Sequence, residues 1–478
     1  MPHAVQYKPA VRHPLFRHLV VPISLFASAF GAHANTFVGN FQFDDFSAVL
    51  ENPHLERWQT FIGHLDHMVR PVLYATFLMD RALYGENPMG YHLLNLFLHL
   101  GSGVFVYRIL ARAVTQDALR LPFWASLLFL IHPIQTEAVT YISGRATGLM
   151  AFFYLLALFL YIKASEVQDA PKAYRLYLSG AIASFAMSLG SKETAMTFPL
   201  MLLLWDTVIG RLSRRSLRAA ILSRHLPFWI VLLLAGAWAL SHPRYSFLAQ
   251  VSIHLRPVWE NFLSEVHAVA YALMLYFHPW KQNFDHDLPV FHSLIQWPLL
   301  FDLSILVGMA VTALFTLRRL PLLSFGIIWF FIQLLPTSLI PRADLFSERN
   351  LYLASIGLVL ATVVLASCLM QWVTTALPNA RAVQFGGYSV VLPVVFLLGF
   401  LTHQRNLVYR DQVSFWSDTV RKSPNKARAH NNLGHAHALE GEWDEAIEEF
   451  RAAARLDPDN ALAQKNLRDA YLHRVGRL

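Results

Sequence analysis

The sequence predicts an all-α protein, in which a polytopic bundle of transmembrane helices is followed by a short soluble repeat domain. Of the 478 residues, 55% are hydrophobic and only 15% are charged, and the mean hydropathy is +0.38. This composition is too apolar for a soluble domain. Apolar windows of roughly 20 residues recur along the chain, which is the length that crosses about 30 Å of hydrocarbon. Beyond residue 403 the composition turns polar. We therefore expect a membrane domain over 1–402 and a repeat domain over 403–478.

About eleven segments are expected to cross the membrane. The first is the amino-terminal segment, and the others lie near 91–112, 121–140, 147–163, 175–190, 194–209, 223–241, 299–316, 321–338, 349–372 and 386–402. The window 262–279 contains Glu265 and His267, which favours a tilted or re-entrant helix over a twelfth crossing. Residues 70–83 are short and amphipathic, as in a helix at the membrane interface. Eleven crossings put the carboxy terminus on the outer face.

The amino-terminal segment has two interpretations. Arg12 and Arg17 precede "LVVPISLFASAFGAHA", which resembles either a signal peptide or an uncleaved first span. Both start from a basic cytoplasmic end, so both put Asp44 and Asp45 on the outer face. The net charge of +8 comes from Arg and Lys between the spans, which is typical of cytoplasmic loops and requires no nucleic acid partner. The single cysteine, Cys368, excludes a disulfide framework within the chain.

The polar tail follows the tetratricopeptide pattern. Residues 427–460 carry the characteristic residues of a 34-residue tetratricopeptide repeat at the expected spacing, namely Leu433, Gly434, Ala446, Phe450, Ala453 and Pro458. Flanking segments match a preceding second helix and a following first helix, which gives about two repeats. Because about three repeats are needed for independent stability, this tail should lean on the membrane domain or on a protein partner.

Charged residues gather in four outer segments, "FDD" at 43–45, "HPIQTEAVTYISGR" at 132–145, "SKE" at 191–193 and "PRADLFSERN" at 341–350. Taken separately, the acid pair could start a helix and each Glu next to Lys or Arg could be a structural ion pair. Together they suit phosphate recognition coupled to proton removal, as in the transfer of a sugar from a lipid phosphate. The spacing of His132 and Glu137 does not predict a metal site. The candidate residues are Asp44, Asp45, His132, Glu137, Arg145, Lys192, Glu193, Glu348 and Arg349.

The ordered motifs "FDD", "RPV", "GENPMGYHLLNLFLHL", "HPIQTEAVTYISGRA", "SKE" and "SERNLYL", with the repeat tail, resemble the transmembrane and tetratricopeptide repeat-containing protein O-mannosyltransferases of the GT-C glycosyltransferase superfamily. The resemblance covers nearly the whole chain. It implies a polyprenyl-phosphate-linked sugar donor, a hydroxyl acceptor on protein Ser or Thr, and no metal or other cofactor. It makes Asp44 or Asp45 the base and Arg145, Lys192 and Arg349 ligands of the lipid phosphate.

The tail has about two repeats where animal members carry a long array, so the chain looks more like a bacterial relative. The resemblance then implies the inner membrane, with the active site and the repeats facing the periplasm, and it leaves the sugar open. Three other interpretations stay open. The acceptor is a glycolipid or glycan, as for a polymerase or ligase; the chain is a non-catalytic anchor that presents its repeats to protein partners; or the charged residues line the path of a transporter.

Overall fold

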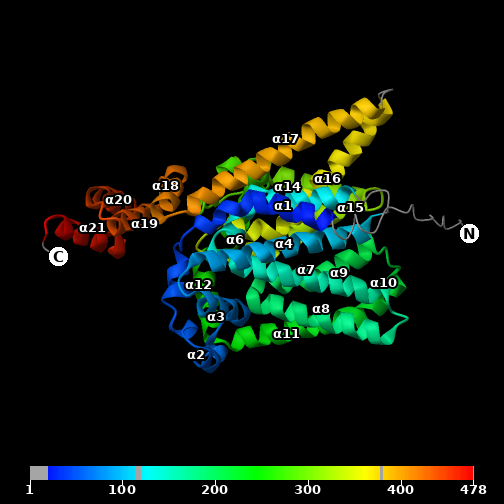
Figure 1. The fold of residues 1–478 in the computed structure, drawn as a ribbon, viewed down its shortest axis with the longest axis horizontal. Coiled ribbons are helices and arrows are strands. Elements are labelled where there is room, and N and C mark those ends of the chain that lie inside the picture. The colour runs from blue at the N-terminus through cyan, green and yellow to red at the C-terminus, as the bar shows by residue number, and fades with distance from the viewer. Residues whose placement is uncertain (1–19, 115–119, 377–379, 477–478) are drawn as a thin grey trace, which may run out of the picture.

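The computed structural model describes residues 20–114, 120–376 and 380–476, and the regular elements in these ranges are all helices. Figure 1 shows the longer ones running side by side as a bundle, with the repeat domain at one end. The bundle helices are α1 (Val21–His33), α4 (Pro88–Ala113), α5 (Arg120–Ile131), α7 (Arg145–Glu166), α8 (Pro171–Ser191), α9 (Phe198–Leu204), α11 (Leu226–Ser241), α13 (Val258–Phe277), α14 (Leu299–Thr316), α15 (Pro321–Leu339), α16 (Leu351–Ala376) and α17 (Ala380–Asn406). Shorter helices connect them: α2 (Trp58–Gly63), α3 (Pro71–Tyr84), α6 (Thr136–Val139), α10 (Arg214–Ala220) and α12 (Pro243–Leu255).

Seven helices of the described residues are long and apolar enough to cross a membrane, against the eleven crossings expected from the sequence. They are Pro88–Ala113, Ile142–Glu166, Arg214–Ser241, Leu299–Thr316, Pro321–Leu339, Glu348–Ala376 and Ser389–Tyr409. The other expected spans correspond to helices that are shorter or more polar, namely α1, α5, α8 and α9. The basic residues Arg12 and Arg17 lie outside the described residues.

The expected window 121–140 is not one helix, because the chain turns at Pro133. Helix α5 ends at Ile131, and the His132 ring accepts a hydrogen bond from the Ile134 amide at 3.2 Å. A single turn over Pro133–Gln135 then leads into α6. A proline has no amide hydrogen and disfavours helix in the residue before it, which explains the break. The break places Glu137 in the short helix α6 at the end of the bundle rather than within a span.

Close packing of α15 against α16 depends on two glycines. A side chain on Gly357 would meet the backbone carbonyl of Gly326, and the reverse also holds. The Trp329 indole donates a hydrogen bond to the Leu353 carbonyl at 2.7 Å across the same contact. Small residues let membrane helices approach closely enough for such packing. The contact fixes the first turns of α16 and thereby the short turn Glu348–Asn350 that precedes it.

The repeat domain consists of α18 (Gln412–Lys422), α19 (Ala427–Leu439), α20 (Trp443–Leu456) and α21 (Ala461–Arg474). The helices α19 and α20 form one complete pair, in which Gly434 lies against the Phe450 ring. Together with the single helices on either side, this agrees with the predicted two repeats. The last bundle helix, α17, continues past residue 402 and ends at Asn406.

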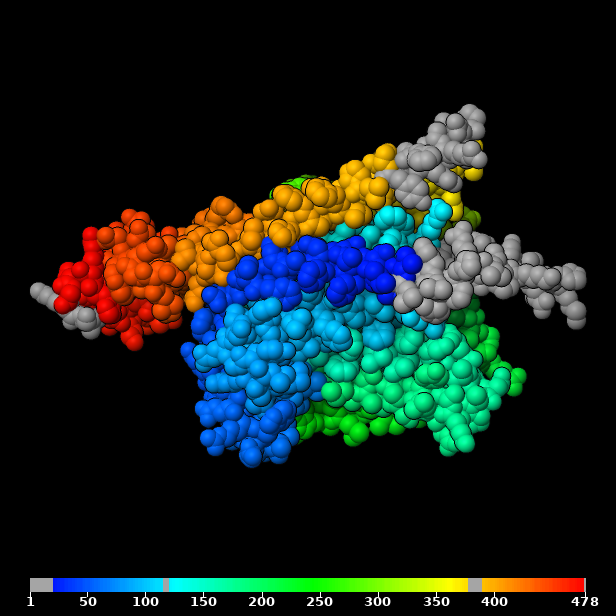
Figure 2. Space-filling model, viewed as in Figure 1, coloured from blue at the N-terminus to red at the C-terminus, as the bar shows by residue number. Residues whose placement is uncertain are grey.

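The repeat domain leans on the membrane domain, one of the two arrangements expected for so short an array. Phe284, from the loop after α13, packs with Phe43, Phe415 and Trp416, and its ring lies 4.5 Å from that of Phe415. Figures 1 and 2 show α18 and α19 at the end of the bundle where α2 and α3 lie, whereas the arginine-rich α10 lies at the opposite end. This separation agrees with the loop charges expected from the sequence.

Candidate functional site

A charged cavity of about 590 Å³ opens at the end of the bundle near the repeat domain. Its walls come from the loop after α1, the start of α3, the segment after α8, and the loop between α15 and α16. These segments lie far apart in the sequence. The charged residues in the lining are Asp44, Arg70, Lys192, Glu193, Arg342, Asp344 and Arg349.

The two adjacent acids have different environments. The Asp44 side chain lines the cavity, and its carboxylate has no hydrogen bond or ion pair among the residues that the structure describes. Only its backbone is tied, because its amide donates to the Tyr141 hydroxyl at 3.0 Å. Asp45 is fully buried and accepts hydrogen bonds from the Ser143 amide and hydroxyl and from the Gln42 amide. Asp44 is therefore available to a ligand, whereas Asp45 holds the turn.

Burial sets the protonation of Asp45. The loss of water raises the pKa of its carboxyl to about 7, although the hydrogen bonds from Ser143 and Gln42 act in the opposite direction. A neutral Asp45 would leave Asp44 as the only negative charge on this turn near neutral pH. Conversely, ionisation of Asp45 adds a second negative charge next to the cavity.

Lys192 reaches the cavity from the segment after α8. Its ammonium group donates to the Thr147 hydroxyl at 2.8 Å and to the Asn350 amide oxygen at 3.3 Å. Burial, together with the positive charges of Arg349 and Arg70, lowers the pKa of this amine to about 7. These two partners are neutral, so the charge of Lys192 is left for an anionic ligand.

Glu137 holds Arg349 at the cavity wall. This carboxylate is 1% exposed and accepts hydrogen bonds from the Ser347 hydroxyl at 3.0 Å and from the Arg349 amide at 2.8 Å. The Arg349 guanidinium lies 3.4 Å from the same carboxylate and is 32% exposed. Burial raises the pKa of Glu137, and the charge of Arg349 opposes this rise. Glu137 therefore acts on the cavity through Arg349 rather than by lining it.

Two further arginines line the cavity without being among the predicted site residues. Arg70 forms two hydrogen bonds with Glu193, at 2.8 and 3.1 Å, and so partly neutralises that acid. Arg342 lines the same wall and has a buried Nε atom without a hydrogen-bond partner among the described residues. The sequence signal for Arg342 was its place in the charged segment 341–350, whereas Arg70 stood alone before Pro71.

Besides Asp45 and Glu137, three other predicted site residues lie outside the lining. His132 is buried, with its ring stacked on Tyr276 at 4.7 Å between centroids. Arg145 is fully buried and pairs with Asp80 at 2.5 Å, so its charge is already matched within the protein. Glu348 points away from the cavity into the loop that follows α13.

An apolar groove lies on helices that also contribute to the charged cavity. It has a volume of about 470 Å³ and is lined from α2, α3, α7 and α8, the last three of which also border the cavity or end beside it. Trp58, Phe61, Met79 and Phe153 are among its lining residues. A charged cavity and an apolar groove thus share the same helices.

Comparisons with known proteins agree with the resemblance that the motifs indicated. A sequence model of the tetratricopeptide repeat family matches residues 427–460. Protein O-mannosyl-transferase Tmtc3 of Drosophila melanogaster is 25% identical over 89% of this chain and 54% of its own length. Protein O-mannosyl-transferase TMTC1 of Homo sapiens is 24% identical over 91% of this chain and 55% of its own length. The chain thus spans about half the length of these relatives.

Among solved structures, the crystal structure of ArnT from Cupriavidus metallidurans bound to undecaprenyl phosphate is similar, with a TM-score of 0.48 and 13% sequence identity. The match covers 97% of this chain and 79% of that chain. The relatives and the seven apolar helices identify the present chain as an integral membrane protein.

Proposed function

We propose that the chain is a membrane glycosyltransferase, which moves a sugar from a polyprenyl-phosphate-linked donor to a hydroxyl acceptor. The observation that carries this proposal is the cavity itself. Its walls hold Lys192, Arg349, Arg342 and Arg70 together with Asp44, whose carboxylate has no partner among the described residues. A carboxylate opposite several cations suits a reaction that removes a proton from one partner and leaves negative charge on the other. The similarity to protein O-mannosyl-transferases over most of the chain supports the same reaction class.

In this reaction Asp44 accepts the proton of the acceptor hydroxyl as its oxygen bonds to the anomeric carbon of the sugar. The bond between that carbon and the phosphate oxygen breaks, and the electron pair leaves with the polyprenyl phosphate. The departing phosphate gains negative charge, which Lys192 and Arg349 stabilise. Asp45 fixes the turn that presents Asp44, through its hydrogen bonds to Ser143.

The apolar groove lined from α2, α3, α7 and α8 suits the hydrocarbon chain of such a donor. Its lining includes Trp58, Phe61 and Phe153, and burial of apolar chain against such side chains is favourable. Polyprenyl phosphates combine an apolar tail with an anionic head, so we assign the head to the charged cavity and the tail to apolar surface such as this groove. Membrane lipid fills the groove when no donor is bound.

Protein Ser or Thr is the proposed acceptor, by analogy with the protein O-mannosyl-transferases. The arginines of α10 at the opposite end of the bundle support an orientation with the cavity and the repeats on the outer face, which is the periplasmic face in the proposed bacterial inner membrane. A protein partner held by the repeats is then also periplasmic. The sugar itself is assigned only by that analogy.

The test is sugar transfer by the detergent-purified chain, supplied with labelled polyprenyl-phosphate sugars and either a periplasmic extract or purified glycolipid. We expect Asp44→Asn to abolish transfer, because removal of a general base usually costs about 10²-fold to 10⁴-fold in rate. Asp45→Asn keeps side-chain volume and should retain measurable transfer. Label on glycolipid alone would replace the protein acceptor, and transfer unchanged by Asp44→Asn would refute the mechanism. Absence of transfer from every donor by wild type would favour the anchor hypothesis.

A further inference from the structure

The four residues Ser347–Asn350 have contacts on both sides of the cavity wall. Ser347 and Arg349 bind Glu137, and Asn350 accepts a hydrogen bond from Lys192. Glu348 lies between them in sequence but points the opposite way, out of the cavity. A displacement of Glu348 therefore moves the backbone that carries Arg349 and Asn350.

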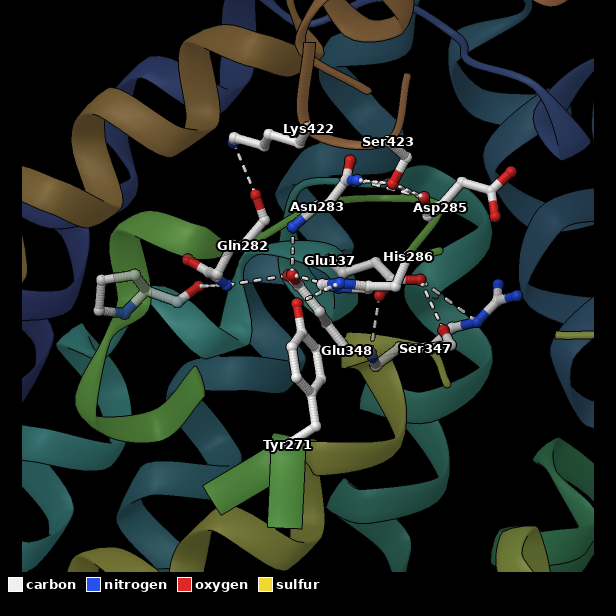
Figure 3. A network of polar contacts seen from close by, with 12 residues as sticks. Glu137, Tyr271, Gln282, Asn283, Asp285, His286, Ser347, Glu348, Lys422 and Ser423 are labelled. Atoms are coloured by element: carbon white, nitrogen blue, oxygen red, sulfur yellow. Dashed lines mark hydrogen bonds and ion pairs between the residues drawn. The ribbon is translucent and has the colours of Figure 1, made fainter. Parts of the chain in front are cut away.

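Glu348 is held by the loop that follows α13. One carboxylate oxygen accepts hydrogen bonds from the backbone amide of Asn283 at 2.5 Å and from the His286 ring at 3.0 Å. The other oxygen accepts a hydrogen bond from the Gln282 side chain at 3.0 Å. The other His286 nitrogen lies 3.0 Å from the Tyr271 hydroxyl. Glu348 is 1% exposed. Figure 3 shows these side chains converging on the carboxylate.

The repeat domain is bound to the membrane domain at this same loop, residues 282–286. Lys422, at the end of α18, donates to the Gln282 carbonyl at 2.6 Å. The Ser423 hydroxyl accepts from the Asn283 side chain at 2.7 Å and donates to the Asp285 carbonyl at 2.8 Å. Figure 3 shows Lys422 and Ser423 on the side of the loop away from Tyr271.

Ion pairs extend the contact with this loop to the start of α19. Lys426 and Arg428 pair with the buried Asp285 at 2.9 and 2.8 Å. Arg428 also pairs with Asp344, which lines the cavity. The repeat domain and the cavity wall therefore contact opposite sides of one short loop.

We propose that Glu348 and His286 are positioning residues for Arg349. Through them, the contact between the repeat domain and the loop 282–286 influences binding of the donor phosphate. This inference rests on the proposed function, because it uses the assignment of Arg349 to the phosphate. The loop 282–286 transmits a displacement of the corner between α18 and α19 to Glu348, and Glu348 transmits it to Arg349. A protein that binds the repeats and moves this corner would change the affinity for the donor.

The measurement is the dissociation constant of the purified full chain for polyprenyl phosphate, which carries the lipid and the phosphate without the sugar. Glu348→Gln replaces one acceptor oxygen by an amide that cannot accept the converging hydrogen bonds. We expect binding to weaken by about tenfold, within the range found for residues that couple two sites. Ser423→Ala changes only the repeat side and should weaken binding by about threefold.

Two control variants separate positioning from general destabilisation. Asp206→Asn alters another buried carboxylate, which binds Tyr161 and His225 before α10 at the far end of the bundle. Arg474→Ala removes an ion pair to Asp444 elsewhere in the repeat domain. Both should lower thermal stability at most and leave the dissociation constant within about twofold of wild type.

The outcomes distinguish this inference from the proposed function. Wild type that does not bind polyprenyl phosphate refutes the proposed donor, and the inference falls with it. Wild type that binds, with Ser423→Ala and Glu348→Gln equal to it, overturns the inference alone. An equal loss in Asp206→Asn overturns it as well, because the effect then follows stability. If Glu348→Gln does not fold, the dissociation constants of Ser423→Ala and Arg474→Ala are compared instead, and equal values overturn the inference.

Discussion

The pKa of Lys192 predicts that donor binding takes up a proton. In the empty cavity burial and the nearby guanidinium groups of Arg349 and Arg70 lower the pKa of this amine to about 7, so above that pH it is largely neutral. A bound phosphate favours the charged ammonium and raises its pKa towards the ordinary value. Binding above pH 7 therefore requires protonation of Lys192, and affinity must fall as pH rises.

The magnitude follows from the titration of one group. Each pH unit above about 7 costs about a factor of ten in affinity, or 1.4 kcal/mol, as long as the pKa in the complex stays above the assay pH. Because the amine is half charged at pH 7, the dissociation constant should rise about fiftyfold between pH 7 and 9. Over this range polyprenyl phosphate is already largely a dianion, because its second pKa is about 6, so the ligand contributes little to the slope.

The assay is titration of the detergent-purified chain with polyprenyl phosphate at several pH values, for wild type, Lys192→Arg and Lys192→Met. Lys192→Met should bind weakly at every pH, with a flat profile. Lys192→Arg should also give a flat profile but bind more tightly than wild type at pH 9, because arginine stays charged. A wild-type profile that is flat from pH 7 to 9, or a slope that persists in Lys192→Met, would show that Lys192 is not the group that takes up the proton.

Three further predictions concern the stability of the scaffold. Arg145→Met leaves the buried Asp80 unpaired and should lower the free energy of unfolding by about 3–5 kcal/mol, and the double variant with Asp80→Asn should recover part of it, as thermal unfolding in detergent would show. Phe284→Ala removes the ring between the loop and the repeat domain and should cost about 2 kcal/mol, seen as faster proteolytic release of the repeats, whereas an unchanged rate would mean that the ion pairs suffice. Gly357→Ala forces a methyl group against Gly326 and should lower stability by about 1–3 kcal/mol; an unchanged midpoint would contradict the tight contact of α15 with α16.

The sequence was informative about the site wherever charges stood beside helix breaks. Asp44, Lys192, Glu193 and Arg349 were selected because they follow apolar segments on one face, and the structure brings all four to one cavity. Arg145 satisfied the same criterion but pairs with Asp80 of α3, and no sequence pattern links these two residues. An ion pair between distant segments has no local signal.

Glu348 and Arg349 show the same limit within two adjacent residues. Neighbouring side chains at the start of a helix point in different directions, so one lines the cavity and the other meets the loop after α13. Asp44 and Asp45 separate in the same way, because Asp45 is buried with hydrogen bonds from Ser143 and Gln42, whereas Asp44 lines the cavity. Sequence position alone gives no reason to prefer either acid.

The sequence by itself determined that the chain is a helical membrane protein with a short repeat tail, because apolar length and the 34-residue spacing are local properties that burial requires in any arrangement. Only the tertiary structure decided which charges are matched inside the protein and which face a ligand. That division depends on which segments pack together, as when Asp80 neutralises Arg145 while Asp44 has no described partner. Only the tertiary structure showed that the repeats bind to the loop 282–286, because ion pairs such as that of Lys426 with Asp285 join segments far apart in the chain.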